Sequence, residues 1–364
     1  MRIIIDARLW SESGIGRYVR NLIEGLQRAD HQNEYYVLHL QDDFDKLVYR
    51  AENFHKILAD FRWYTFSEQI KLPKIINSLK PDLIHFPHFN VPIFYKGKFV
   101  VTIHDLIHQH FQTRDASTHG PIIHTIKKIG YRKTFSHAVS GSSKIITPSN
   151  FVKEQLVNEW NVPEGKITIT YEAVEDNFLR LAQKANGKIT VKKPYLFYVG
   201  NAQPHKNLLI LIKVFKKLKE KYQDLSLVLS GPPHKFWEDI KAVSHIGGVI
   251  FTGFVSDNEL AGLYKNAKIF VMPSLEEGFG LPVLEAMAAG CPIASSNAGS
   301  LPEVGGNALL YFDPKNENDI AEKISQALDD KNLRNDLIKK GKIRYKQFSW
   351  QKLAEQTLGV YRSS

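Results

Sequence analysis

Two glutamates, Glu277 and Glu285, lie eight positions apart in the stretch EEGFGLPVLEA at 276–286. A loop carboxylate such as Glu277 can accept hydrogen bonds from sugar hydroxyls. A carboxylate about one turn into a helix, such as Glu285, can accept the paired hydroxyls of a ribose, as an acidic residue does in dinucleotide-binding folds. The ordinary alternative makes Glu277 a charge at a helix start and Glu285 part of a solvated helix face. The residues around the pair favour the binding interpretation.

The loop between the two glutamates has the composition of an anion site. Gly278 and Gly280 permit unusual backbone angles and the close approach of another group. Pro282 suits the first turn of a helix, where a missing N–H costs no hydrogen bond, so we expect a helix to begin at Leu281. The N–H groups of the loop and the positive end of this helix would then bind an anion.

Lys206 follows a strand-like run at 195–199 and a loop that contains Gly200 and Asn201. The ammonium group of a lysine is a compact point charge, which suits the neutralisation of a departing diphosphate. The position of Lys206 in the segment that follows a strand therefore predicts a second group for the same anion.

A short glycine loop, Ser13-Gly14-Ile15-Gly16, separates the first strand-like run from a helical stretch. Its backbone N–H groups would suit an anion, but a plain strand–helix turn explains the glycines equally well. The loop is not a GxGxxG motif, because Val19 stands where the third glycine would be. This departure counts against a dinucleotide-binding protein.

Several histidines follow strand-like runs. His104 and Asp105 come at the carboxyl end of the run at 99–103, which favours a functional over a structural role. His85 and His88 are expected to face the same cleft, and either role is open for them. His108, His110 and His119 cluster nearby, but their spacing matches no standard zinc pattern, so we expect no metal site.

Short apolar runs that alternate with helical stretches must position these residues. The strand-like runs are 2–6, 35–40, 83–86, 99–103, 144–147, 195–199, 225–229, 249–251, 269–272, 293–295 and 309–312. Apolar spacing typical of amphipathic helices occurs at 17–27 and 208–219, whereas 281–289 is apolar on all sides, as in a buried helix. This alternation predicts an α/β protein with parallel sheets covered on both faces.

The pattern restarts near Tyr195, after a polar segment at 180–193 that has the composition of a linker. We therefore expect one domain at 1–185, a second at 186–347, and a final helix at 348–364 that Ser349 can cap. Ligands of open parallel sheets bind outside the carboxyl ends of the strands, so the functional residues should gather in a cleft between the two domains.

The bulk properties agree with two globular domains. The chain has 364 residues, a formal net charge of +10 and one cysteine, Cys291. One cysteine allows no internal disulfide, which fits a reducing, cytoplasmic compartment. The start lacks the features of a signal peptide, and no apolar run is long enough to span a bilayer. The positive charge favours anionic partners but does not distinguish nucleic acid, lipid and phosphorylated small molecules.

The motifs together resemble family 4 retaining glycosyltransferases of the GT-B fold. The glutamate pair matches the E-x7-E motif of that family. Further segments match in family order: MRIIIDARLWSESGIGRYVRN at 1–21, TIHDL at 102–106, TPSNF at 147–151, YVG at 198–200, HKNL at 205–208, TGFV at 252–255 and GSLPEV at 299–304. The style is similar to that of bacterial mannosyltransferases of polysaccharide and lipopolysaccharide assembly.

The resemblance implies two Rossmann-like domains that face each other across a cleft, with the C-terminal helix returning to the first domain. It implies metal-independent transfer, with retained configuration, of a hexose from a nucleotide-sugar to a saccharide or lipid-linked acceptor. His104, Glu277 and Lys206 would be the catalytic group. The donor would contact Gly14, Gly16, Asn201, Lys206, Phe254, Val255, Glu277, Gly278, Phe279, Gly280, Leu281 and Glu285.

Within that set, the resemblance assigns individual roles. His104 would hold the 6-hydroxyl of the transferred sugar, the glycine loop at 14–16 would face the diphosphate, and the backbone at Phe254-Val255 would hold the base. Many family members have an arginine directly after Gly200, where this chain has Asn201. Because of this departure, Lys206 lacks the arginine that in many family members helps to neutralise the diphosphate. GDP-mannose is the preferred donor only by similarity of style.

The segment 121–153 contains six Lys or Arg and no Asp or Glu, and it could rest on an anionic membrane surface. One predicted helical face carries Ile122, Ile123, Ile126 and Ile129; another carries mainly Lys127, Lys128, Arg132 and Lys133. An ordinary surface helix is the alternative.

The whole chain has alternatives as well: an epimerase or phosphorylase of the same fold, a non-catalytic nucleotide-sugar binder, and a nucleic-acid-binding protein. No nucleic-acid motif supports the last, and the oligomeric state is open.

Overall fold

The computed structural model describes residues 1–111, 121–184, 191, 194–233 and 235–364, with the backbone alone for 121–127. Two compact units divide the described chain. The first unit holds 1–106, 121–172 and 350–364, and the second holds 107–111 and the described part of 173–349. The last helix therefore belongs to the same unit as the first strand.

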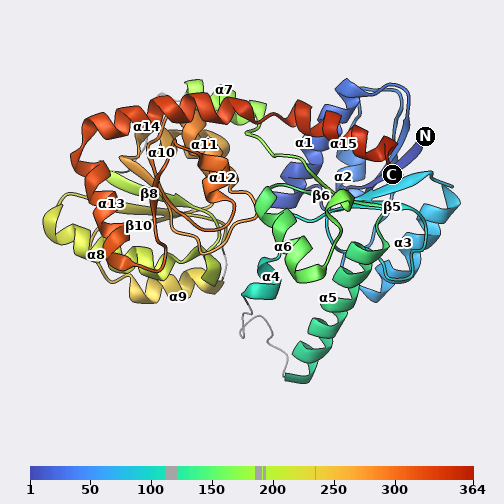
Figure 1. The fold of residues 1–364 in the computed structure, drawn as a ribbon, viewed down its shortest axis with the longest axis horizontal. Helices are drawn as coiled ribbons and strands as arrows, with labels where there is room; N and C mark the ends of the chain where they lie inside the picture. Colours follow the sequence, from blue (N-terminus) through green and yellow to red (C-terminus); the bar gives the residue numbers. More distant parts are fainter. Residues whose placement is uncertain (112–120, 185–190, 192–193, 234) are drawn as a thin grey trace. The chain divides into compact units, whose positions relative to one another are not determined.

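The first unit is built on a parallel sheet of seven strands in the order β3-β2-β1-β4-β5-β6-β7 (Figure 1). The strands are β1 (Arg2–Asp6), β2 (Glu34–His39), β3 (Phe54–Leu58), β4 (Leu83–Phe86), β5 (Phe99–Thr102), β6 (Lys144–Thr147) and β7 (Ile167–Ile169). β1, β4, β5 and β6 lie in the sheet interior and are almost entirely buried, as expected for parallel strands covered on both faces.

The second unit has a parallel sheet of six strands in the order β10-β9-β8-β11-β12-β13. The strands are β8 (Tyr195–Val199), β9 (Ser226–Ser230), β10 (Val249–Gly253), β11 (Ile269–Met272), β12 (Ile293–Ser296) and β13 (Leu310–Phe312). The two sheets confirm the predicted α/β class, and eleven of the strands overlap the strand-like runs of the sequence.

Helices connect the strands of both units. Those of the first unit are α1 (Gly14–Ala29), α2 (Gln41–Lys46), α3 (Phe66–Ser78), α5 (Pro121–Gly141), α6 (Asn150–Trp160) and α15 (Trp350–Arg362). Those of the second are α4 (Ile107–His110), α7 (Asp176–Lys184), α8 (Leu208–Lys221), α9 (Lys235–Val243), α10 (Asp257–Asn266), α11 (Leu281–Ala289), α12 (Leu301–Gly305), α13 (Glu317–Asp329) and α14 (Lys331–Arg344).

The last helix, α15, packs along α1 in the first unit. The two helices approach so closely that a Cβ atom on Gly25 would lie 2.6 Å from the Cβ atom of Ala354. Side chains cross the same interface: the rings of Tyr18 and Trp350 meet edge to face at 6.4 Å. The C-terminal segment is thus an integral layer of the first unit.

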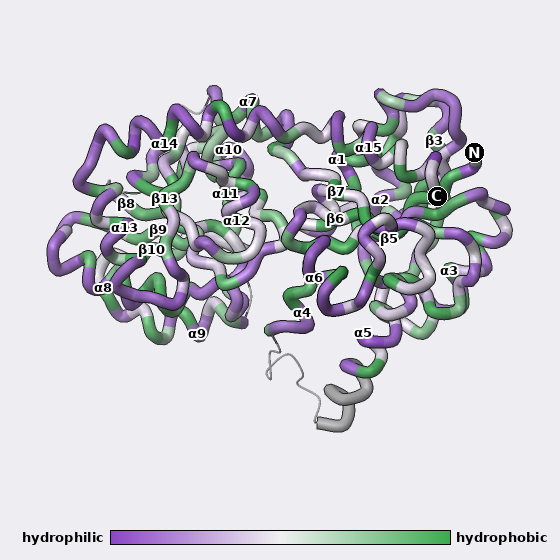
Figure 2. The backbone as a smooth tube through the Cα atoms, in the orientation of Figure 1, coloured by the Kyte–Doolittle hydropathy of each residue, from purple (hydrophilic) through white to green (hydrophobic). Residues whose placement is uncertain are grey.

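In the second unit, the buried side of α11 is apolar except for Glu285, and α14 packs against this helix. α14 is largely hydrophilic along its length, as Figure 2 shows, because it forms the outer layer. The polar segment at 180–193 was expected to be a linker. Its first part, up to Lys184, instead belongs to α7, which packs against α10 and α11, so the division between the units falls before this helix. Residues 185–190, 192 and 193 lie outside the described part.

Within the described part of the chain, no helix is both long and apolar enough to cross a bilayer. The expected basic helix is partly outside the described residues, because the side chains of Ile122, Ile123, Ile126 and Lys127 are not described. Beyond them, Lys128, Ile129, Arg132 and Lys133 are exposed, while Phe135 and Ala138 on the same helix are buried in the core.

Candidate active site

Lys206 and Glu277 form an ion pair at the carboxyl edge of the second sheet. The Lys206 Nζ atom lies 2.7 and 2.9 Å from the two carboxylate oxygens of Glu277. Lys206 follows β8 and Glu277 follows β11, the two neighbouring strands between which the strand order reverses. Ligands of open parallel sheets bind at such a reversal. The structure thus brings together two predicted site residues at the position where a ligand is expected.

The loop from Glu276 to Gly280 is held by a second loop, after β12. The N–H group and the hydroxyl of Ser300 both donate to the Glu277 carbonyl oxygen, and the hydroxyl also bonds the Phe279 carbonyl. Gly299 lies so close that a Cβ atom there would be 2.7 Å from the Glu277 nitrogen. The GSLPEV segment therefore fixes the backbone that carries Glu277.

The loop ends in a left-handed turn that starts α11. Gly280 precedes the helix with a φ angle of 99°, a conformation that favours glycine. Leu281 and Pro282 form the first turn, as predicted. The first N–H groups of the helix have no partner inside the helix, and with the helix dipole they can bind an anion.

Glu285 is buried on α11, with only 4% of its surface exposed. The Tyr264 hydroxyl donates to its Oε2 atom at 3.0 Å. This burial excludes the alternative of a solvated helix face. Tyr264 comes from α10, so two helices together fix the orientation of this carboxylate.

The segment after β8 orients Lys206 through its neighbours. Asn207 has a φ angle of 59°, and its side-chain amide donates to the carbonyl oxygens of Pro273 and Pro314. His205 is buried; burial, with the charge of Lys206 adding to it, lowers the pKa of His205 to about 4. Asn201 accepts the Tyr198 hydroxyl on its carbonyl oxygen, and its side chain bonds the Gln203 N–H group.

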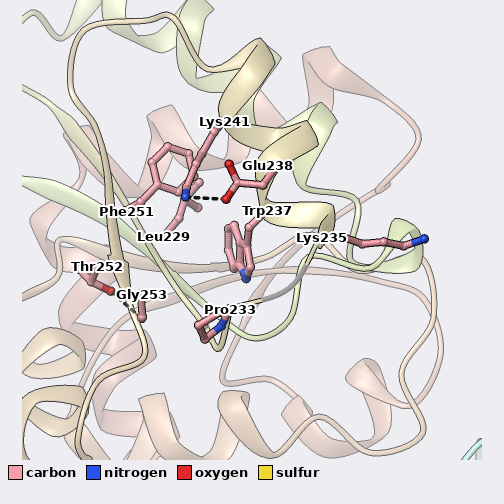
Figure 3. Close-up of a pocket in the computed structure, with 10 residues that line it drawn as sticks. Leu229, Pro233, Lys235, Trp237, Glu238, Lys241, Phe251, Thr252 and Gly253 are labelled. Carbon is pink, nitrogen blue, oxygen red and sulfur yellow. Dashed lines mark hydrogen bonds and ion pairs between the residues drawn. The ribbon is translucent and has the colours of Figure 1, made fainter. Parts of the chain in front are cut away.

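The loop Gly253–Val255 borders a pocket of about 530 Å³ in the second unit. Gly253 has a φ angle of 69°, and its carbonyl oxygen accepts from the Gly231 N–H group, which ties the ends of β9 and β10 together. Figure 3 shows the pocket, where Lys241 and Glu238 pair on α9 and the Trp237 indole lies near Pro233. The Trp237 Nε1 atom is buried and has no hydrogen-bond partner among the described residues. Phe254, at the edge of this loop, is 76% exposed.

In the first unit, His104 is held through both ring nitrogens. Its Nε2 atom lies 2.9 Å from the Pro87 carbonyl oxygen, and its Nδ1 atom lies 3.2 Å from a carboxylate oxygen of Glu172. Both partners are acceptors, so both nitrogens donate when the ring is an imidazolium. Burial opposes the charged ring, but hydrogen bonding and charge from Glu172 raise the pKa of His104 above its ordinary value.

Gly14 and Gly16 form the first turn of α1. A Cβ atom on Gly16 would lie 2.4 Å from the Trp10 carbonyl oxygen, so close packing alone requires glycine there. Nothing lies within 4 Å of a Cβ atom on Gly14. Close packing therefore explains the glycine at position 16, whereas it does not explain Gly14.

One expectation for the other histidines needs correction. His85 does not face a cleft: it is fully buried in the first unit, between the Tyr361 hydroxyl at 2.7 Å and the Thr102 hydroxyl at 2.8 Å. His110 bonds the Glu276 carboxylate at 2.8 and 2.9 Å within the second unit. His119 lies outside the described residues. Where the structure is described, no three His, Cys, Asp or Glu side chains are grouped to hold a metal ion.

Comparisons with known proteins agree with this geometry. The family model described as Glycosyltransferase Family 4 matches residues 13–178, and the model described as Glycosyl transferases group 1 matches residues 180–344. The O-antigen chain mannosyltransferase B of Escherichia coli is 29% identical, over 96% of both chains. The chain belongs to family 4 of the glycosyltransferases.

Solved structures show that this glycosyltransferase has the GT-B fold. A sucrose-phosphate synthase from Thermosynechococcus elongatus superposes with a TM-score of 0.77 at 20% identity, over 100% of this chain and 98% of that one. The structure of Anabaena Alr3699/HepE in complex with UDP and glucose superposes with a TM-score of 0.75 at 15% identity, over the whole of both chains. The likeness is one of fold.

Two residues that contact predicted site residues of the glycosyltransferase were missed in the sequence. Glu172 comes soon after the short strand β7, which has only three residues and gives no clear apolar run. Tyr264 lies on a helix whose other buried residues are apolar, and nothing in its spacing marks it as the partner of Glu285. The signal that could have found Glu172 is its place soon after a strand, where polar residues of parallel sheets gather.

Proposed function

We propose that this glycosyltransferase transfers a hexose, with mannose favoured, from a nucleotide-diphosphate sugar to a hydroxyl of a saccharide or lipid-linked saccharide. The observation that carries the proposal is the Lys206–Glu277 pair beside the N-terminus of α11. Lys206 is suited to an anionic leaving group, and Glu277 is suited to sugar hydroxyls. The mannosyltransferase relative supports mannose, and GDP-mannose is the preferred donor.

In the proposed reaction, the bond between the anomeric carbon and the diphosphate oxygen breaks while the acceptor oxygen forms a bond to the same carbon. Lys206, the first turn of α11 and the glycine loop at Gly14–Gly16 stabilise the departing diphosphate. Glu277 and His104 position the sugar, which develops oxocarbenium character. The proton of the acceptor hydroxyl leaves with the diphosphate.

Retention of configuration follows from a front-face mechanism in this proposal. Glu277, the carboxylate assigned to the sugar, is paired with Lys206 through both oxygens, and its assigned role is positioning rather than attack. The same charge arrangement supports transfer without a metal ion, because Lys206 and helix N-termini supply the positive charge that a metal would supply elsewhere.

The donor nucleotide has its own proposed contacts. Glu285 accepts the ribose hydroxyls, and its fixed orientation against Tyr264 supports a directional role. The backbone at Phe254-Val255 holds the base, next to the pocket that Trp237 lines. The Asn201 carbonyl oxygen, held by Tyr198, supports a structural role for Asn201 in place of the charge that an arginine gives to many relatives.

A thermal-shift panel tests this assignment. GDP-, UDP-, ADP- and dTDP-sugars are added at equal concentration, because a ligand that binds only the folded state raises its stability by mass action. We expect GDP-mannose to give the largest increase in Tm. No increase with any of the four classes would refute a nucleotide-sugar enzyme, and a larger increase with another class would change the donor.

We also propose contact with an anionic membrane surface at the inner face of the membrane, through the segment 121–153. Lys128, Ile129, Arg132 and Lys133 are exposed on α5, which gives this helix both charge and an apolar side chain for such a surface. Lys153 on α6 contributes less, because it pairs with Glu164 at 2.9 Å.

A further inference from the structure

A short segment, Ile107–Phe111, lies in sequence between strands β5 and β6 of the first unit but packs in the second unit. The chain leaves the first unit after Leu106, and only Asp105 and Leu106 separate this segment from His104. The segment contains the single turn α4, and its Ile107 side chain is buried. No role proposed above uses this segment, here called the strap.

The strap contacts the residue that precedes Glu277. The His110 Nδ1–H group donates to the two carboxylate oxygens of Glu276 at 2.9 and 2.8 Å. The two side chains keep only 26% and 11% of their surfaces exposed, so salt and solvent screen this contact less than they would a surface pair. One peptide bond joins Glu276 to Glu277, and the strap therefore restrains the backbone next to the site carboxylate.

The strap also contacts the residue that precedes Lys206. The Phe111 ring packs on the His205 ring, with the ring centres 5.7 Å apart and the ring planes inclined by 50°. His205 is almost completely buried, and its carbonyl oxygen accepts the Leu275 N–H group at 2.7 Å. This hydrogen bond joins the loop after β8 to the loop after β11. The Phe111 ring thus packs where the two loops of the ion pair are connected.

Two consecutive strap residues hold the positions directly before the two members of the ion pair. The loop after β11 contains Gly278 and Gly280, which permit many backbone conformations, so contacts from outside the loop have to restrict it. Catalytic groups have to lie within about 0.5 Å of their productive positions, and a displacement of about 1 Å can cost on the order of 10²-fold in rate. A pair that closes through both carboxylate oxygens requires this precision on both loops.

We propose that the strap positions the Lys206–Glu277 ion pair. His110 acts through Glu276, and Phe111 acts through the residue before Lys206. Both strap residues are positioning residues, because neither has to contact the donor in this role. A strap that only stabilised the second unit would leave the geometry of the pair unchanged. The effect on transfer rests on the proposed function, whereas the effect on the pair itself does not.

Acetylation of lysine amines in the full-length protein tests the strap, because an ammonium group held by a carboxylate has to separate from it before its amine reacts. Mass spectrometry after treatment with N-acetoxysuccinimide gives the rate at Lys206, with the 68% exposed Lys213 as internal reference. His110→Ala and Glu276→Ala should each raise the Lys206 rate about threefold or more, because the pair opens more often. The double variant should raise it no further, because either change breaks the same contact.

Matched variants separate positioning from loss of structure. His110→Asn should keep the Lys206 rate near that of the unmodified protein, because an asparagine amide can take the place of Nδ1 and donate to Glu276. Phe111→Ala tests the second contact independently of the first and should also raise the rate. His245→Ala, at an exposed histidine of the same unit, should leave it unchanged. The Tm of each variant is measured, so that rates are compared at equal folded fraction.

The contrary outcomes are defined in the same experiment. An unchanged Lys206 rate in His110→Ala and Phe111→Ala overturns the strap, as does a His110–Glu276 double variant whose effect is the product of the two single effects. GDP release from GDP-mannose is measured on the same proteins and should slow about tenfold in His110→Ala. Unchanged release despite a raised labelling rate would also refute the positioning role. If the unmodified protein releases no GDP while the labelling rates change as expected, the proposed function fails and the strap stands.

Discussion

The Lys206 ammonium group lies 2.7 and 2.9 Å from the two carboxylate oxygens of Glu277, although 71 positions separate these residues in the chain. Both side chains are mostly buried, with 14% and 9% of their surfaces exposed. Each therefore satisfies the charge of the other, and a bound donor diphosphate would compete with Glu277 for Lys206. In the proposed mechanism, the pair makes transfer and local stability interdependent.

Lys206→Ala should slow transfer by about 10²–10³-fold, because the departing diphosphate loses a preorganised positive charge. The variant also leaves a buried carboxylate without its partner, so the free energy of unfolding should fall. Turnover is measured with the folded fraction known from circular dichroism. Lys213→Ala, at a lysine that is 68% exposed, is the matched control and should have normal turnover. Near-normal turnover of Lys206→Ala would remove this residue from the mechanism.

Glu285→Ala should weaken donor binding by about 10- to 100-fold, because two hydrogen bonds from the ribose to a charged acceptor are lost. Isothermal titration with the nucleotide-sugar measures this affinity directly. Glu285→Gln keeps an acceptor near the Tyr264 hydroxyl, so its donor affinity should lie between those of the unmodified protein and Glu285→Ala. The exposed carboxylate of Glu322, changed to alanine, serves as the control. Unchanged affinity in Glu285→Ala would contradict the ribose role.

The His104–Glu172 pair should stabilise the fold more at low pH than at high pH. The pKa of His104 is raised in the folded state, although burial opposes it, because Glu172 stabilises the charged ring. Stability from a raised pKa is fully present below the unfolded value of about 6.5 and is lost as pH rises through the folded pKa. Compared with Glu172→Gln, the unmodified protein should therefore have its largest advantage in the free energy of unfolding below pH ~6.5.

Urea unfolding of both proteins across this pH range measures the advantage. Burial lowers the pKa of His39 and of His205, and the charges that act on them do not include His104 or Glu172, so both titrate alike in the two proteins and cancel in the difference. Glu34→Gln removes the exposed partner of His55 and is the control, because a solvated pair contributes little at any pH. A difference that does not change with pH would show that Glu172 does not set the charge of His104.

Removing positive charge from α5 should reduce membrane binding. Arg132→Ser with Lys133→Ser should weaken binding to vesicles that contain phosphatidylglycerol by about tenfold or more, because each basic residue near an anionic surface contributes roughly 1 kcal/mol. Flotation measures the bound fraction. Lys71→Ser with Lys74→Ser, two exposed lysines on α3, is the matched control. If the unmodified protein does not float with anionic vesicles, the membrane proposal is wrong.

Chelation should leave the activity intact. Transfer measured with EDTA in metal-free buffer is expected to match transfer with added Mg²⁺ or Mn²⁺, because Lys206 and the helix N-termini supply the positive charge for the diphosphate. A loss of activity that Mn²⁺ restores would show that the donor enters with a metal ion. Donor affinity is measured with EDTA and with added metal ion as well, and a difference between the two values would show that the ion acts on donor binding.

The interior strands were predictable from sequence, and the two edge strands of the first sheet were not. Runs such as Ile3–Ile5 and Ile269–Met272 are continuous and apolar because both faces of a central parallel strand are covered. β3 and β7, at the two edges of the first sheet, are partly exposed and carry polar residues or only three positions, so no apolar run marks them. Missing β7 also hid Glu172, which follows it.

The glutamate loop could be predicted because its signal is local: glycine, proline and a helix start lie within a few positions. The ion pair with Lys206 could not, since its geometry depends on which strands of the sheet are neighbours. His85 shows the opposite error. Its place near a strand end suggested a cleft, but the returning helix α15 covers it and supplies Tyr361 as its partner. No local sequence pattern predicts the His85–Tyr361 contact, because 276 positions separate the two residues.

The return of α15 to α1 has a consequence for how the protein is made. A ribosome releases the first sheet long before it translates Trp350–Arg362. Until α15 is made, the side of α1 that carries Tyr18 is uncovered, and His85 lacks its Tyr361 partner. The second unit, whose described residues up to Ser349 are all translated earlier, can assemble in the meantime. The half of the chain that is synthesised first is thus the half that is completed last.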